Sequence, residues 1–416
     1  MDTFQIPLGI PNVEVLRVEH NKVNDYIITV RSSQTSTRCK TCGHKITKVH
    51  GHAEPLLLRH LPILGHQVYI RIKPIRYYCS HCDTTPTTTE QPDWYTQKSQ
   101  MTHAYEEHLM RTLIGSTIQD VSRKEEIGYD SVKAVLNRQI ETEPNWENFS
   151  KLELLGLDEI ALKKGHKDFV VIVSTHISGV TKIISVLPNR LKITVKSFFE
   201  LIPTRLKKTV KTVCSDMYDG YINAAKEVFG KHVHVVVDRF HVAKHYRKSI
   251  DSLRKQELKR LKKELTEDEY KKLKGAMWAL RKKEEDLKEE DKLILKNLFN
   301  YSSSLKTAYT FQNSLTDLFN QDYGKTKASA EIKAWIRMVK ESELVCFDGF
   351  ISCLEEHWNE ILNYFYRKGR KNSGFIEGLN NKIKIIKRRC YGMLNVKNLY
   401  QRIYLDQEGY QIFAYS

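Results

Sequence analysis

The chain has 416 residues, which is too long for one ordinary core, so we expect two to four domains that each bury their own apolar surface. Its 67 Lys and Arg residues against 50 Asp and Glu residues leave a formal charge of +17, which favours binding to a polyanion through counterion release. A mini-protein of single function is excluded, while nucleic acid and a membrane surface both stay open as partners.

The hydropathy pattern and the cysteines indicate the compartment. No window approaches the roughly 20 consecutive apolar residues that a membrane span needs, and Met1 to Ile10 has no basic segment followed by an apolar one. Four of the eight cysteines form two CxxC pairs, and the other four, Cys214, Cys346, Cys353 and Cys390, are scattered. We therefore expect a cytoplasmic protein without membrane contact, in a reducing compartment, with one cysteine metal site.

The first ninety-odd residues form a β-rich module by pattern, with alternating stretches such as Tyr26 to Arg31 and Gln67 to Ile72. Within it, Cys39 and Cys42, then Cys79 and Cys82, place two thiolates on each of two tight turns, which is the arrangement that closes a tetrahedral shell around zinc. Free cysteines, or His44 or His81 in place of one sulfur, remain alternatives. Four protein ligands leave no open position, so the predicted site is structural.

A loop is expected from Thr84 to Pro92, and the pattern then turns helical from Tyr105 to Ile140. A short helix from Ile118, a turn at Gly128 and a second helix near Ser131 to Arg138 predict a helix-turn-helix whose second helix enters the major groove. Asp130 or Ser131 is the expected cap. Three apolar residues would face the core (Val132, Val135 and Leu136), and four polar residues would face DNA (Lys133, Asn137, Arg138 and Gln139). An ordinary helical hairpin fits the periodicity equally well.

From Leu152 onward, strands alternate with helices and predict an α/β domain with a mixed sheet. The expected strands are Leu152 to Leu157, Phe169 to His176, Lys182 to Leu187, Thr209 to Cys214 and Val233 to Val237, and the expected helices are about Thr194 to Leu201 and Tyr218 to Phe229. Between about Val242 and Asn300, a run of Lys, Arg, Glu and Leu indicates an insertion of charged amphipathic helices. The remainder is helical by pattern, with Trp335, Phe347, Leu354, Trp358, Leu362 and Phe365 available for burial.

Three carboxylates are candidates for metal-dependent phosphodiester chemistry. Asp158 and Asp216 each follow an apolar strand, and aspartates at the ends of neighbouring strands can hold two divalent cations about 4 Å apart. Glu377 would complete the cage from a helix whose apolar face is Ile376, Leu379, Ile383 and Ile386. Oxygen ligands favour magnesium, with manganese as a substitute. A cap or turn role is the alternative for each aspartate.

Further residues lie close to these acids in the sequence. Asp238, also at a strand end, is a rival metal ligand, and the roles of Asp238 and His241 stay open. Lys384, Lys387, Arg388 and Arg389 follow Glu377 on the same helix, where they could clamp phosphates or form a solvated basic face.

Taken together, four stretches and the CxxC pairs resemble the DDE transposases of bacterial insertion sequences, in the ISL-three family. The stretches are Gly156 to Ile160 with Lys164-Gly165-His166, Ser215 to Tyr221, Asp238 to Lys244, and Ser373 to Lys384. The resemblance implies a zinc-binding N-terminal domain, a helix-turn-helix and an RNase H-like catalytic domain interrupted by a helical insertion, with Asp158, Asp216 and Glu377 as the triad. One small departure is Asn372-Ser373-Gly374, where the family often has Ser-Asn-Gly.

The expected organisation is therefore a zinc-ribbon-like domain (1–92), a helix-turn-helix (93–148), the first part of the catalytic core (149–245), a helical insertion (246–365) and a C-terminal catalytic helix region (366–416). The expected function is a bacterial, nucleoid-associated transposase, dimeric on double-stranded DNA, that cleaves insertion-sequence ends by metal-dependent hydrolysis and joins the 3′-hydroxyls to target DNA. A DNA-binding regulator without cleavage activity is the alternative, and a structure-selective nuclease such as a junction resolvase is a third possibility.

Overall fold

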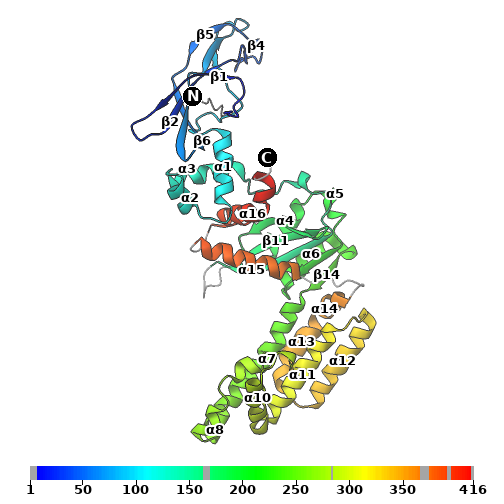
Figure 1. Ribbon diagram of the computed structural model, residues 1–416. Helices are drawn as coiled ribbons and strands as arrows, with labels where there is room; N and C mark the ends of the chain where they lie inside the picture. The colour runs from blue at the N-terminus through cyan, green and yellow to red at the C-terminus, as the bar shows by residue number, and fades with distance from the viewer. Residues whose placement is uncertain (1–6, 163–168, 283, 366–373, 391–394, 414–416) are drawn as a thin grey trace. The chain divides into compact units, whose positions relative to one another are not determined.

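The computed structural model describes residues 7–162, 169–282, 284–365, 374–390 and 395–413, without the side chains of 374–377 and 380. These residues form two compact units, one made of 1–141 and 404–416 and the other of 142–403. Figure 1 labels their elements in chain order, and we describe each unit by itself. Among the described residues, no helix is both long enough and apolar enough to cross a membrane.

The first unit contains a four-stranded sheet in the order β1 (Val13–His20), β2 (Tyr26–Ser32), β7 (His66–Ile72) and β6 (Leu56–Ile63). Strands β2 and β7 are parallel and the other two pairs are antiparallel. The alternating apolar residues of β7 are all fully buried (Val68, Ile70 and Ile72). Burial of one face in this way is what the alternation in the sequence predicts.

Five short strands surround the cysteine turns. They are β3 (Thr37–Arg38), β4 (Lys45–Ile46), β5 (Val49–His52), β8 (Ile75–Tyr78) and β9 (Thr87–Thr89). Strand β9 lies where the sequence predicts a loop from Thr84 to Pro92, so that prediction is wrong for these three residues. The threonine run has high strand propensity, and β9 pairs with the edge of β8.

Three helices follow in the same unit: α1 (His103–Leu113), α2 (Ile118–Lys124) and α3 (Tyr129–Gln139). As expected, Val132, Val135 and Leu136 are buried. The prediction of Asp130 or Ser131 as the cap is wrong. Helix α3 begins at Tyr129, so its N-cap is Gly128, which has no side chain to form a capping hydrogen bond. The last helix of the chain, α16 (Val396–Phe413), begins in the second unit and ends in the first, where Asp406 accepts a hydrogen bond from the Gly115 backbone N–H at 3.0 Å.

The second unit is built on a five-stranded mixed sheet in the order β12 (Val180–Leu187), β11 (Phe169–Ile177), β10 (Leu154–Ala161), β13 (Thr212–Ser215) and β14 (His234–Val237). Strands β10, β13 and β14 are parallel, and β11 is antiparallel to both of its neighbours. The turn between β11 and β12 is Ser178-Gly179, and both residues have positive φ, as a two-residue hairpin turn of this twist requires. The predicted mixed sheet is confirmed.

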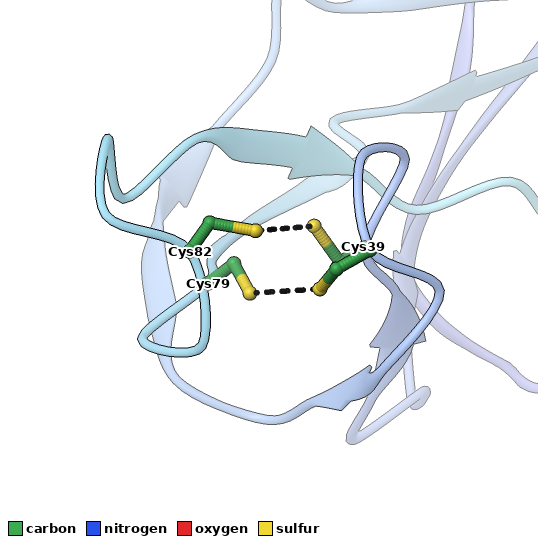
Figure 2. Close-up of side chains that lie close together, drawn as sticks. Cys39, Cys79 and Cys82 are labelled. Atoms are coloured by element: carbon green, nitrogen blue, oxygen red, sulfur yellow. Dashed lines mark hydrogen bonds between the residues drawn. The ribbon is translucent and has the colours of Figure 1, made fainter.

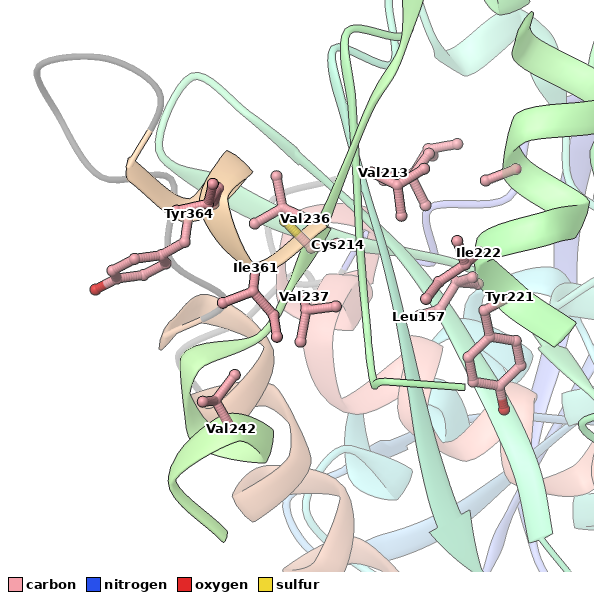
Figure 3. Close-up of a cluster of buried hydrophobic side chains, with 14 of the residues drawn as sticks. Leu157, Val213, Cys214, Tyr221, Ile222, Val236, Val237, Val242, Ile361 and Tyr364 are labelled. Carbon is pink, nitrogen blue, oxygen red and sulfur yellow. The ribbon is translucent and has the colours of Figure 1, made fainter. Parts of the chain in front are cut away.

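Helices α4 (Lys192–Leu201), α5 (Thr204–Lys207) and α6 (Asp219–Phe229) connect these strands. Figure 3 shows the core between sheet and helices, where Leu157 of β10 lies beside Tyr221 and Ile222 of α6. Because successive side chains of a strand point to opposite faces, Asp158 points away from the face on which Leu157 is buried. The core therefore fixes the direction of the Asp158 carboxylate.

Beyond the sheet, the second unit continues as helices, visible as the elongated group of ribbons from α7 to α14 in Figure 1. They are α7 (Arg239–Glu264), α8 (Glu267–Lys271), α9 (Ala276–Ala279), α10 (Glu289–Tyr301), α11 (Ser303–Asn320), α12 (Lys325–Glu341), α13 (Asp348–Glu356) and α14 (Trp358–Leu362). The Lys-rich stretch has an apolar cluster of its own, which includes Leu261, Leu280 and Leu298. Of the six large residues expected to be buried in the C-terminal part, only Trp358 is half-buried and the other five are buried.

Candidate active site and zinc site

The four cysteines of the CxxC pairs come together, with their sulfurs within 4.8 Å of one another. Figure 2 shows Cys79 and Cys82 on one turn facing Cys39 on the other. The Cys39 and Cys82 sulfurs are 4.0 Å apart, and those of Cys42 and Cys79 are 3.5 Å apart. Sulfurs around a tetrahedral zinc with Zn–S bonds of about 2.3 Å lie roughly 3.8 Å apart, so the four side chains fit zinc.

The backbone of each turn supports a thiolate. The N–H of Thr41 points to the Cys39 sulfur and that of His81 to the Cys79 sulfur, both at 3.4 Å. Backbone hydrogen bonds from Cys42 and Thr41 lower the pKa of Cys39 to about 6, and the thiolate is the form that binds metal. Two neighbouring histidines, His44 and His81, stack on each other with ring centres 4.8 Å apart, and neither belongs to the cluster.

Of the two aspartates expected as metal ligands, Asp158 lies on β10 and Asp216 comes directly after the neighbouring parallel strand β13. Asp216 directly follows β13, as predicted. Asp158 does not lie at the end of a strand: it pairs with Ile172 in the middle of β10, which continues to Ala161. The prediction of a strand end at Leu157 is wrong because antiparallel pairing with β11 extends β10 beyond the point where its pairing with β13 stops, at Gly156.

His241, in the first turn of α7, joins the two aspartates. Its Nδ1 lies 3.0 Å from an Asp216 oxygen and its Nε2 lies 3.9 Å from an Asp158 oxygen. Asp238, the rival ligand, accepts a hydrogen bond from the Phe240 N–H at 2.8 Å and thereby caps α7. The site is thus assembled from β10, the end of β13 and the start of α7, which follows β14.

Burial and the histidine set the charges of this site. Burial raises the pKa of Asp158 to about 6, although the charge of His241 acts in the opposite direction. Burial would also raise the pKa of Asp216, but the His241 hydrogen bond and charge hold it below its usual value. Burial would lower the pKa of His241, but the Asp216 hydrogen bond raises it above its usual value. One histidine thus faces two half-buried carboxylates. The carboxylate oxygens are the ligand atoms that hard cations prefer.

The expected third acid belongs to α15 (Gly374–Arg389), which contacts β10 and β12. The Glu377 side chain lies outside the described residues, as do Ile376 and the Lys164-Gly165-His166 stretch. The other three residues of the predicted apolar face are buried: Leu379, Ile383 and Ile386. The Lys387 ammonium donates a hydrogen bond to the Ala161 carbonyl at the end of β10, so α15 is attached to the sheet by apolar and polar contacts.

The sequence of the second unit matches the ISL3 (ISL-three) family of DDE transposases over residues 155–403, which is more than half of the chain. Residues 35–82 match the zinc-finger of the transposases of IS204, IS1001, IS1096 and IS1165. The chain belongs to the ISL3 family of DDE transposases. The expected family is therefore confirmed, and these matches favour a transposase over a regulator that only binds DNA.

Two curated relatives of this ISL3 family member match over most of their length. The transposase for insertion sequence element IS1001 of Bordetella parapertussis is 26% identical over 88% of this chain and 87% of its own. The transposase for IS1557 of Mycobacterium tuberculosis is 22% identical over 98% of this chain and 96% of its own. The match to the zinc-finger family and the four gathered cysteines together support zinc at the N-terminal site.

In this family member, two of the residues expected to contact DNA form hydrogen bonds within the protein. The Arg138 guanidinium donates to the buried Glu106 carboxylate at 2.6 Å, and Gln139 donates to the same carboxylate at 3.2 Å. Asn137 is exposed and Lys133 is half-buried on α3, and on α15 Lys384 and Arg388 are exposed.

Sequence reasoning left the role of His241 open. Its proximity to Asp216 follows from the sheet order, because β14, which precedes α7, lies next to β13. Two signals in the sequence pointed to it: Asp238-Arg239-Phe240-His241 directly follows an apolar strand, and the same residues belong to one of the stretches that resemble the family.

Proposed function

We propose that this chain cleaves DNA at the ends of an insertion sequence by metal-dependent hydrolysis and joins the freed 3′-hydroxyls to target DNA. The observation that carries the proposal is the half-buried pair Asp158 and Asp216 on neighbouring strands, joined through His241. Membership of the ISL3 transposase family gives the reaction class. We further propose an RNase H-like core, which the family resemblance implies for a mixed sheet with acids at these positions.

Asp158, Asp216 and Glu377 are the proposed ligands of Mg²⁺ or Mn²⁺. Bound there, two divalent cations would activate the attacking oxygen and stabilise the leaving oxygen of the phosphodiester. The protein's own contribution is to position the ligands: β10 and the end of β13 hold two carboxylates, and α15, which contacts β10 and β12, would carry the third. His241 is a positioning residue, because its Nδ1 contacts an oxygen of Asp216 and thereby restricts the rotation of that carboxylate.

The cleavage test uses labelled DNA that carries the element's own ends, with Mg²⁺ in the buffer. We expect Asp158→Asn, Asp216→Asn and Glu377→Gln each to abolish end-specific nicking while DNA binding persists. Asp317→Asn is the matched control, because Asp317 is an exposed acid on α11 of the same unit. Full cleavage by Asp158→Asn would contradict the triad, and loss of cleavage in Asp238→Asn alone would move the second ligand to Asp238.

We also propose that α2 and α3 form a helix-turn-helix that reads the ends of the element. The support is that Asn137 is exposed and Lys133 is half-buried on α3, at the positions from which a recognition helix contacts bases and phosphates. Lys384 and Arg388 of α15 are proposed phosphate contacts near the metals, whereas Lys387 is already bonded to the Ala161 carbonyl. In a binding assay, Asn137→Ala should reduce the preference for end DNA over unrelated DNA, and Lys133→Ala should weaken both.

The proposed active assembly is at least a dimer on paired ends, as expected for a transposase that acts on two ends of one element. Light scattering of the complex with paired-end DNA measures this directly. A complex that contains a single protein chain would contradict the proposed dimer.

A further inference from the structure

We propose a second metal site, separate from the three acids and the four cysteines, formed by Asp219, Glu356 and His357, for a divalent transition-metal ion such as Zn²⁺. Each of these residues offers one ligand atom, and the three atoms lie within 4.8 Å of one another. Asp219 is the first residue of α6, Glu356 is the last residue of α13, and His357 lies between α13 and α14.

The two carboxylates of this site have no counter-charge in the described part of the chain. Neither Asp219 nor Glu356 forms a hydrogen bond or ion pair through its side chain there, although the protein carries a formal charge of +17. Two exposed like charges held this close repel each other. A bound cation would remove this repulsion, and exposure of both carboxylates leaves room for water at the remaining coordination positions.

The histidine is the independent observation that points to a ligand. His357 is only 6% exposed, and within the described residues its ring forms no hydrogen bond or ion pair, although it faces the two carboxylates. A ring nitrogen of His357 is therefore available to coordinate a metal, and imidazole with carboxylates is a common ligand set for zinc.

The backbone around the site is held firmly. Phe350 and Leu354 of α13 are buried in the main core, and the Cys353 sulfur lies 3.7 Å from the Met217 sulfur, which ties α13 to the turn before α6. On the other side, Lys226 of α6 forms an ion pair with Glu360 of α14 at 2.6 Å.

Helices α6 and α13 and the junction between α13 and α14 therefore present the ligands from fixed positions, which favours metal binding because little conformational entropy is lost when the ion binds. The carbonyl end of α13 at Glu356 also favours a cation. A metal at this site would connect the helical region to the catalytic sheet, three residues after Asp216.

The test is a calorimetric titration of Zn²⁺ into full-length protein whose cysteine site is already loaded with zinc, in a buffer with excess Mg²⁺ to occupy Asp158 and Asp216. We expect one further equivalent to bind to wild type and to Asp158→Asn. The equivalent should be lost in Glu356→Gln and in His357→Asn.

Glu355→Gln is the matched control, because it removes the same charge one residue away, from an exposed carboxylate that pairs with Lys340 at 3.3 Å. It should bind zinc like wild type. His357 is buried, so the His357→Asn variant could misfold. In that case the test rests on Glu356→Gln and Asp219→Asn, which are both at exposed positions. Wild type that takes up no zinc beyond the cysteine site, or Glu356→Gln that binds like wild type, would overturn the proposal. End cleavage with Mg²⁺ alone is a separate readout, so failure of this site leaves the proposed function intact.

Discussion

The attachment of α15 to the sheet can be weakened without touching any acid. Ile383 is fully buried on this helix, whereas Ile385, two residues later, is 62% exposed. Ile383→Ala deletes three buried carbons, and at about 0.8 kcal/mol each the lost transfer free energy is roughly 2.4 kcal/mol. The cavity left behind brings the cost to about 3 kcal/mol. The same substitution at Ile385 should change stability by less than about 0.5 kcal/mol.

A cost of about 3 kcal/mol lowers the ratio of attached to detached α15 by roughly two orders of magnitude. Hydrogen exchange of the α15 amides should therefore accelerate in Ile383→Ala, while the amides of β10 and β13 keep their protection. End cleavage should fall as well, because Glu377 is carried by this helix. Equal exchange rates of α15 in Ile383→Ala and Ile385→Ala would refute the reasoning, since the two variants differ only in the burial of the deleted carbons.

Three further predictions concern stability and metal content. The hydrogen bond from His108 holds the pKa of Glu125 below its usual value of 4.5, so this stabilisation is complete above about pH 4.5 and is lost as the pH falls through the folded-state pKa. Glu125→Gln should thus destabilise the first unit by roughly 1–2 kcal/mol at neutral pH and much less in acid, and a pH-independent difference in denaturant melts would count against it. Cys79→Ser should release zinc, measured by metal analysis, and make the region around the cysteine turns sensitive to protease, whereas full retention of zinc would show that Cys79 is not a ligand. Trp335→Ala, at a buried position, should cost about 3–5 kcal/mol in thermal or denaturant unfolding, while Trp278→Ala, at a position 62% exposed, should cost far less, and equal losses would contradict the described core.

Local patterns in the sequence were sufficient to predict several parts of this protein. The CxxC spacing predicted the metal turns because a thiolate pair on a tight turn is stabilised by nearby backbone N–H groups, here those of Thr41 and His81. The helical periodicity of Leu379, Ile383 and Ile386 predicted the buried face of α15. The position of Asp216 directly after β13 also follows from local pattern, because an apolar run of strand-forming residues stops there.

Other features depend on which segments meet, and only the tertiary structure decides that. Asp158 lies within β10 because pairing with β11 continues past it, which no pattern inside β10 reveals. His241 contacts Asp216 because β14 lies next to β13 in the sheet, so the start of α7 falls beside the end of β13. Arg138, which the helical pattern predicts to contact DNA, also donates a hydrogen bond to Glu106 of another helix.

The same holds for Asp219, which comes close to Glu356 only when α13 packs against the core. Periodicity and turn chemistry act over a few residues and are visible in the sequence. Charge pairing and ligand sets join residues far apart along the chain, so they appear only once the sheet order and the helix packing are known.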